Sequence, residues 1–99
     1  MSVLIVQLVP GDTAQFEAYM AANGKQVEQL TERAKAEGCL AHRFGVGAGK
    51  IVVVDEWETA QQFEAFISSP EIREVMGEMG AQGQPEVTVA ELKGFPGEF

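Results

Sequence analysis

The stretch that decides the fold is Val52-Val53-Val54-Asp55-Glu56-Trp57-Glu58-Thr59, which leads directly into a helical pattern at residues 62–66. Three consecutive valines predict a buried strand, and the acids and tryptophan after them predict polar groups at one rim of a sheet. Thr59 and Gln62 have the spacing of a capping box, and Ser69-Pro70 predicts a break and a new helix start. A strand that feeds a capped helix in this way predicts a small α+β domain.

A hairpin precedes this stretch in the chain. Residues 39–46 and 51–57 are apolar-rich runs with the length of strands, and the glycine-rich segment 45–49 predicts the turn that joins them. Two strands joined by a short turn are antiparallel neighbours in a sheet. The centre of the chain is therefore predicted to contribute two adjacent strands.

Strand alternation predicts which side chains of the hairpin share a face. It places His42 on one face of the first strand and Cys39 and Arg43 on the other. Asp55 and Glu56 are consecutive, so they point to opposite faces and cannot work as a carboxylate pair. One of these two acids is expected to meet Arg43 across the hairpin as an ordinary ion pair, and the other to face water.

The outer segments supply the remaining elements. Residues 3–9 are β-branched and apolar, which predicts a strand covered on both faces. One long helix is predicted between Asp12 and Gly38, with the polar Asn23 on its otherwise apolar stripe. Residues 86–92 alternate well enough to be a final strand.

The order of elements predicts the architecture. Strand, helix, strand, strand, broken helix and strand give an α+β fold of the ferredoxin-like βαββαβ type, with an antiparallel sheet and both helical segments on one face. Residues 1–93 form this single domain and residues 94–99 a tail with two aromatic residues. The other face of the sheet is apolar, which is an aggregation hazard for a monomer. A homodimer that covers this face is predicted, with the tail crossing to the partner.

Charge and composition exclude several classes of partner. Fifteen acidic residues against seven basic ones give a formal charge of −8, which repels phosphate backbones and acidic lipid surfaces, so neither nucleic acid nor membrane is expected as a partner. The single cysteine cannot form an internal disulfide, and no apolar run approaches the roughly 20 residues that span a bilayer. The start of the chain has no basic region of the secretory type, so a cytoplasmic protein is expected.

Four short motifs carry a resemblance to a known family. They are Glu-Gly-Cys-Leu-Ala-His at 37–42, Asp-Glu-Trp-Glu at 55–58, Ala-Phe-Ile-Ser-Ser-Pro at 65–70 and Pro-Glu-Val-Thr-Val at 85–89. With these motifs the chain resembles the antibiotic biosynthesis monooxygenase family, over nearly the whole domain from Val3 to about Leu92. The resemblance implies the dimeric α+β barrel architecture of that superfamily.

The resemblance also implies a function, the cofactor-independent oxygenation of a small aromatic or quinol-like metabolite. Such an enzyme deprotonates an electron-rich phenol so that it can pass an electron to O₂, and it needs an apolar slot, a base and hydrogen-bond donors. His42 is the candidate catalytic base and Asn23 the candidate catalytic donor, and no cofactor is expected. The candidate substrate-binding residues, which are the aromatic, thioether and polar side chains expected around one pocket, are Gln7, Tyr19, Phe44, Asp55, Trp57, Phe63, Phe66, Met76 and Met79.

Haem-degrading members of the family offer a second template. They use an asparagine in the first strand, a tryptophan at the end of the third and a histidine on the following helix as iron ligand. Trp57 matches the tryptophan and Gln7 lies near the asparagine position, but Met76 stands where the histidine would be. The only histidine, His42, lies on a predicted strand. Haem is therefore not expected, and one histidine with one cysteine predicts no metal site within a single chain.

Structural roles and other functions remain open for the same residues. Trp57 can simply pack beneath the following helix, and His42 can be a satisfied histidine in the sheet. Asn23-Gly24 is either a helix irregularity or a break that opens a pocket beside Tyr19. At the level of function, the alternatives are a non-catalytic small-molecule-binding dimer and a polyketide cyclase or isomerase, which needs the same pocket and base but no O₂.

Overall fold

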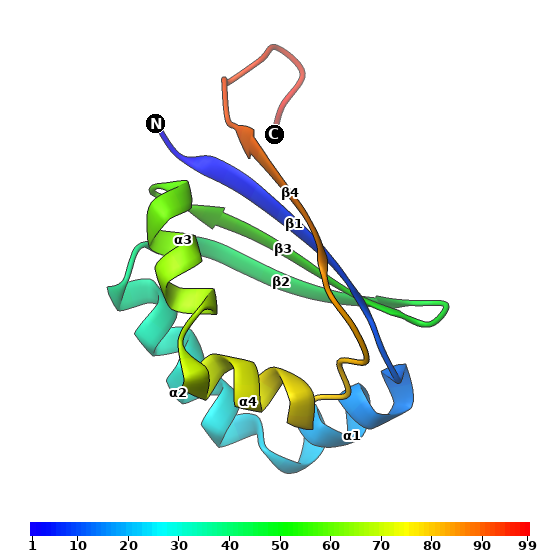
Figure 1. The fold of residues 1–99 in the computed structure, drawn as a ribbon. Coiled ribbons are helices and arrows are strands. Elements are labelled where there is room, and N and C mark those ends of the chain that lie inside the picture. The colour runs from blue at the N-terminus through cyan, green and yellow to red at the C-terminus, as the bar shows by residue number, and fades with distance from the viewer.

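Four antiparallel strands form one sheet, and four helices cover one of its faces (Figure 1). The computed structural model describes residues 1–99. The sheet order is β2-β3-β1-β4, which confirms the predicted ferredoxin-like arrangement with β1 and β3 at its centre. The elements along the chain are β1 (Val3–Pro10), α1 (Thr13–Ala22), α2 (Gly24–Ala36), β2 (Cys39–Gly47), β3 (Lys50–Trp57), α3 (Ala60–Ile67), α4 (Pro70–Glu78) and β4 (Glu86–Glu91).

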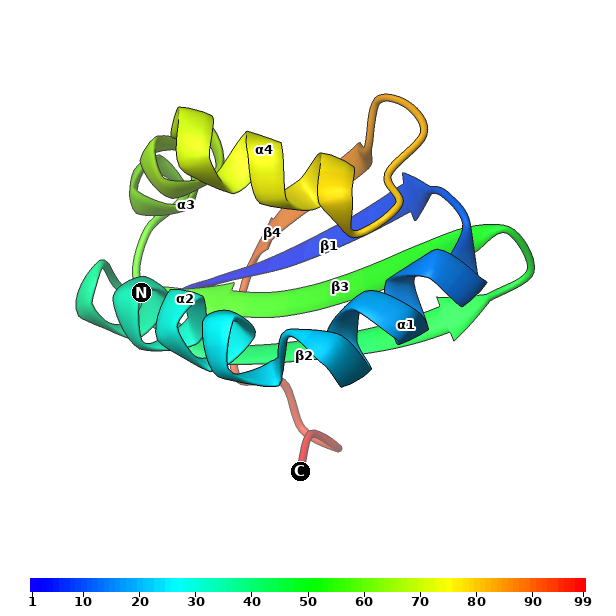
Figure 2. The same ribbon diagram turned by 90° about the horizontal axis from the view of Figure 1, so that it is seen from below.

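The helices lie as two pairs over the same face of the sheet. Figure 2 shows α1 and α2 beside α3 and α4, with β1 and β3 visible between the pairs. None of these helices is both long and apolar enough to cross a membrane. Both helix pairs therefore cover the same face of the sheet and leave the other face open.

Side-chain caps fix where the helices begin. Asp12 accepts a hydrogen bond from the backbone of Gln15 at 3.0 Å, and Thr59 accepts one from the backbone of Gln62 at 3.1 Å. Ser69 caps α4 in the same way, with proline in the first turn. Each cap satisfies a backbone N–H that the helix leaves free, which is why these predicted boundaries are confirmed.

The predicted single helix between Asp12 and Gly38 is wrong, because the chain breaks it at Asn23. The backbone N–H of Asn23 and its side-chain amide both donate to the carbonyl oxygen of Tyr19, at 2.8 and 3.1 Å. Asparagine competes with the helix for backbone partners and the following glycine is a poor helix former, so α1 ends and α2 starts in a new direction.

The alternation predicted for the second strand is also wrong at its start. Cys39 pairs with Trp57 but Ala41 pairs with Glu56, so one extra residue, Leu40, bulges out of the strand. The bulge puts Cys39 on the same face as His42, toward the helices.

The same register decides the partners of the hairpin acids. His42 lies opposite Asp55, and Arg43 lies opposite Val54. The ion pair expected between Arg43 and one of the hairpin acids does not form, because the strand register places the apolar Val54 opposite Arg43. The buried acid, Asp55, is paired with the histidine instead.

The core under the helices consists of two apolar clusters with a polar gap between them. Gln7 lies between Ile5 and Val9 on β1, and Asp55 lies between Val53 and Trp57 on β3, all on the helix-facing side. The first cluster contains Val3, Ile5, Ala34, Cys39, Trp57 and Phe63, and the second contains Val9, Phe16, Ile51 and Val53. The core is thus interrupted at mid-sheet, over its two central strands.

The other face of the sheet has no cover. Its centre is apolar and is formed by the alternate residues of β1 and β3, namely Leu4, Val6, Leu8, Val52 and Val54. The chain exposes 6357 Å², whereas a folded monomer of 10.7 kDa is expected to expose about 5,500 Å². The open face, together with the tail beyond β4, gives this chain more surface than a self-contained domain needs.

Gly11 is a position where the fold requires the absence of a side chain. A Cβ at residue 11 would lie 2.5 Å from the carbonyl oxygen of Gly80, where the loop after α4 passes the end of β1, whereas a Cβ at Gly77 would meet nothing within 4 Å. Gly11→Ala is expected to lower the free energy of unfolding by about 2 kcal/mol through overpacking. Gly77→Ala, the matched control in α4, is expected to leave it unchanged or raise it by up to about 1 kcal/mol. Urea unfolding measures both, and equal midpoints would contradict this account.

Candidate functional site

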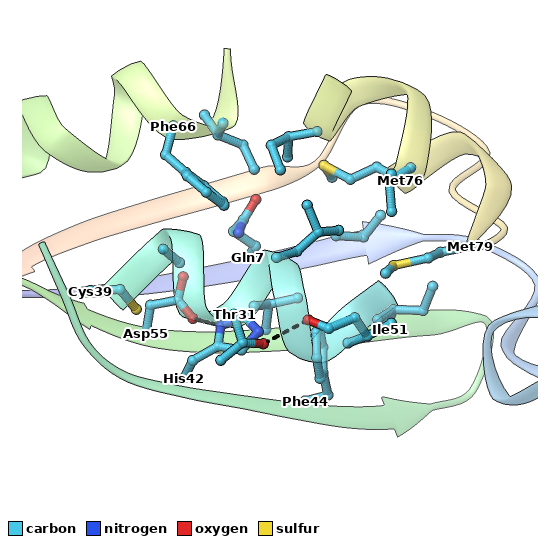
Figure 3. Close-up of a pocket in the computed structure, with 18 of the residues that line it drawn as sticks. Gln7, Thr31, Cys39, His42, Phe44, Ile51, Asp55, Phe66, Met76 and Met79 are labelled. Carbon is cyan, nitrogen blue, oxygen red and sulfur yellow. Dashed lines mark hydrogen bonds and ion pairs between the residues drawn. The ribbon is translucent and has the colours of Figure 1, made fainter. Parts of the chain in front are cut away.

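A cavity of about 120 Å³ lies between the sheet and the two helix pairs (Figure 3). Of its 21 lining residues 17 are hydrophobic, and the four polar ones are Gln7, Thr31, His42 and Asp55. An apolar cavity on the order of 150 Å³ is large enough to hold benzene. The cavity therefore has the size and lining for a small aromatic ligand that carries a few polar groups.

His42 and Asp55 form a hydrogen-bonded pair in the floor of this cavity. The Nδ1 atom of His42 lies 2.5 Å from Oδ1 of Asp55, and only 5 % of the Asp55 side chain is exposed against 28 % of the His42 side chain. An ionised carboxylate only accepts hydrogen bonds, so Nδ1 carries the proton and donates it. In the neutral ring this leaves Nε2 as the free acceptor, which is the arrangement of a general base.

Trp57 lies on the same strand as Asp55 and binds the second oxygen of its carboxylate. Its indole N–H donates to Oδ2 of Asp55 at 3.1 Å, and only 1 % of Trp57 is exposed. The ring packs against Phe63 and Phe66, with centroids 5.9 and 5.5 Å away. Trp57 is thus a core residue and also a hydrogen-bond donor, and with both oxygens bonded the carboxylate is held in one orientation toward His42.

Gln7 is the buried polar residue whose hydrogen bonding is incomplete. It is 4 % exposed, and its Oε1 atom is buried without any donor. A buried acceptor without a partner costs about 1–3 kcal/mol, so groups of this kind are rare in folded proteins. Figure 3 shows the side chain standing up from β1 into the space below the helices.

Thr31 is a lining residue that the sequence interpretation missed. Its hydroxyl donates to the carbonyl oxygen of Val27, one turn earlier in α2, at 3.0 Å. A signal was available in the sequence, because Thr31 lies four residues after the apolar Val27 and three before Ala34, which places all three on one side of a helix. The signal is weak, because a single threonine on an apolar helix stripe is also typical of a core position without a function.

Cys39 lines the cavity close to the histidine pair. Burial, and then the negative charge of Asp55, raise the pKa of its thiol. The thiol donates a hydrogen bond to the carbonyl oxygen of Ala41 at 3.4 Å. Ligand atoms of Cys39, His42 and Asp55 lie within 4.8 Å of one another, and these are the residues whose types and spacing would suit a metal ion. Their present bonding is that of a hydrogen-bonded cluster, since Nδ1 and Oδ1 bind each other and the thiol is held protonated.

The structure brings most of the predicted site residues together. Eight of them line the cavity, contributed by all three long strands and by α3 and α4, and they are Gln7, His42, Phe44, Asp55, Trp57, Phe66, Met76 and Met79. Met79 lies at the end of α4, where its sulfur points into the same space as Met76 (Figure 3). His42 and the aromatic and thioether side chains of the cavity wall are therefore neighbours in space.

Three predicted site residues lie outside the lining. Asn23 uses its side-chain amide to hold the joint between α1 and α2, and Phe63 packs in the core against Trp57. The hydroxyl of Tyr19 is buried without a hydrogen-bond partner; burial raises its pKa, and the charge of Glu78 adds to the effect although this carboxylate lies outside hydrogen-bonding geometry. These residues support the helices that form the roof of the cavity rather than its surface.

The fold and the site define a class of protein, a ferredoxin-like α+β domain with one apolar pocket between its sheet and its helices. The model of the family described as antibiotic biosynthesis monooxygenase matches residues 6–78. The chain therefore belongs to the antibiotic biosynthesis monooxygenase family. None of the curated proteins matches the chain in sequence.

Solved structures share this fold at low sequence identity. One is a monooxygenase from the gene ActVA-Orf6 of Streptomyces coelicolor, in complex with the ligand nanaomycin D (21% identity, 95% of this chain and 89% of that chain, TM-score 0.66). Another is SnoaB, a cofactor-independent oxygenase from Streptomyces nogalater (16% identity, 98% of both chains, TM-score 0.59). A third is a dimeric ferredoxin-like protein from an uncultured marine organism (15% identity, 95% and 90% coverage, TM-score 0.62).

Proposed function

We propose that this protein is a homodimeric, cofactor-independent monooxygenase that acts on a small electron-rich aromatic compound of the phenol or quinol type. The observation that carries the proposal is the pair of His42 and Asp55, bonded to each other at the floor of an apolar cavity. The monooxygenase and the cofactor-independent oxygenase that share this fold point in the same direction.

His42 acts as the base in this proposal. With its Nδ1–H bonded to Asp55, the ring turns Nε2 toward a phenol hydroxyl and removes its proton. Asp55 stabilises the imidazolium that forms, and Trp57 keeps the carboxylate in place. The apolar lining leaves the phenolate poorly solvated and therefore electron-rich, which favours the transfer of an electron to O₂.

The oxygen chemistry balances without a further reactant. The phenolate passes one electron to O₂, and the resulting radical pair combines to form a carbon–oxygen bond at a ring position that carries hydrogen. The hydroperoxide then loses water, with the proton returned by His42, so that one oxygen atom stays on the ring as a ketone and the other leaves as water. A phenol with a free ring position thus becomes a quinone, and one O₂ is consumed per turnover.

The homodimer belongs to the same proposal. Its support is the open face centred on Val6 and Val54, which is apolar at the centre and has Arg43, Glu56 and Thr88 around it. Dimer interfaces have this pattern of an apolar centre and a polar rim. The ferredoxin-like relative described as dimeric has the same fold.

Oxygen uptake tests the function. The protein is mixed with a panel of single-ring phenols and quinols, and O₂ consumption and product are measured with and without protein, with a 1:1 ratio of O₂ to product as the expected result. Binding without O₂ uptake would replace the proposal with a small-molecule-binding dimer. Turnover that continues under anaerobic conditions would replace it with a cyclase or isomerase.

A further inference from the structure

We infer that Gln7 is a specificity-determining residue that accepts a hydrogen bond from a second hydroxyl group on the ligand, so that the site prefers a neutral dihydroxy aromatic compound. The inference rests on the proposed function only for the position of the first hydroxyl, at His42. Its starting point is the Oε1 atom of Gln7, which is buried at the floor of the cavity and receives no hydrogen bond. A leucine of similar size would avoid that cost, so the carboxamide is not explained by stability.

The other polar groups of the cavity are also acceptors. The Thr31 hydroxyl donates its proton to the carbonyl oxygen of Val27, so it can only accept a hydrogen bond from a ligand. The Nδ1–H of His42 donates to one carboxylate oxygen of Asp55, and the indole N–H of Trp57 donates to the other. Neither N–H is free to bind a ligand. Only the amide nitrogen of Gln7 adds a donor to this set. Because the free acceptors outnumber this one donor, a ligand that satisfies the lining must supply protons, as hydroxyl groups do and quinone carbonyls do not.

The positions of Gln7 and His42 set the shape of the ligand. Gln7 is on β1 and His42 on β2, with β3 between them, so their strands are about 10 Å apart. The register adds a diagonal offset, because Asp55 is opposite His42 while Gln7 is opposite Val53. Two hydroxyls at opposite ends of one ring suit this separation, whereas two adjacent hydroxyls would both lie at one end.

The charges around the cavity also limit which ligands can bind. No lysine or arginine lines the cavity, and its one ionised group is the Asp55 carboxylate. The whole chain carries a formal charge of −8. A ligand with a carboxylate group would enter against this charge without a cation to pair with, so the preferred ligand is neutral.

Anaerobic calorimetry with three single-ring probes tests the inference without any need for turnover. The intact protein is titrated with 1,4-dihydroxybenzene, phenol and 1,4-benzoquinone. The dihydroxy compound is expected to bind about tenfold more tightly than phenol, the effect of one hydrogen bond to a buried acceptor, and the quinone most weakly. Equal affinity for the first two probes, or tighter binding of the quinone, would overturn the inference.

Two variants separate hydrogen bonding from shape. Gln7→Leu is expected to lower affinity for the dihydroxy probe about tenfold, leave affinity for phenol unchanged, and raise the melting temperature of the free protein because the unpaired acceptor is gone. Thr31→Val keeps the size of the side chain and is expected to reduce affinity for the dihydroxy probe by a smaller factor. Equal loss for both probes in Gln7→Leu would assign Gln7 a purely structural role. If selective binding is found but no quinol consumes O₂, the proposed oxygenation fails and this inference stands.

Discussion

Replacing His42 by alanine is expected to lower the rate of oxygenation by a factor of about 10²–10⁴, the usual contribution of a positioned general base. The chain contains no second histidine, and no lysine or tyrosine lines the cavity to take over proton removal. The loss should appear in kcat, because the apolar walls that bind the ring are unchanged. Steady-state O₂ uptake measures the rate, and anaerobic calorimetry checks that the ligand still binds.

Two further variants test the chemistry assigned to this residue. Asp55→Asn keeps the shape of the site but no longer orients and stabilises an imidazolium, so a loss of about 10²-fold or more is expected. Added imidazole is expected to restore part of the activity of His42→Ala, since the substitution leaves room beside Asp55. Gln29→Ala, on the exposed side of α2, is the control and should keep full activity. Unchanged activity in His42→Ala would remove this residue from the mechanism.

Replacing Val6 by glutamate is expected to convert the proposed dimer into a monomer. Val6 is at the centre of the open face, with Val54 on one side and Thr88 on the other. A homodimer contains this face twice, so one substitution buries two carboxylates without partners, at a cost of several kcal/mol. The dissociation constant should rise on the order of 10³-fold.

Sedimentation at micromolar concentration measures this change. The unaltered protein should sediment with twice the mass of the 10.7 kDa chain, and the Val6→Glu variant with the mass of a single chain. Gln29→Glu adds the same charge at an exposed helix position and should remain dimeric. A wild-type protein that sediments as a single chain at this concentration would contradict the proposed assembly, and so would a Val6→Glu variant that still dimerises.

The fold could be predicted from the sequence because its signals are local. The caps at Thr59 and Ser69 involve residues three apart, and each is found where the pattern placed it. The hairpin turn follows from its glycines in the same way. Where local preferences were weak the prediction failed, as at Asn23, where a side chain that competes for backbone partners ended the helix.

The site was predicted only in part, because its contacts depend on register between strands. His42 and Asp55 were both recognised, but which acid faces which side chain across the hairpin was not settled by alternation alone. A bulge of one residue at Leu40 places Cys39 on the same face as His42. The strand register then places His42 opposite Asp55, and Val54 opposite Arg43. A shift of one residue reverses the face of every side chain in a strand, so small irregularities decide such pairs.

The amino-acid sequence by itself determined the order of strands and helices, the acidic charge, and the apolar alternation that leaves one sheet face uncovered. These properties depend on residue type and on spacing over a few positions. Only the tertiary structure decided that Gln7, Thr31, His42 and Asp55 meet in one cavity, because they come from β1, α2, β2 and β3 and are far apart in the chain. Their hydrogen bonds, and the one that Gln7 lacks, exist only after the sheet has paired and the helices have packed on it.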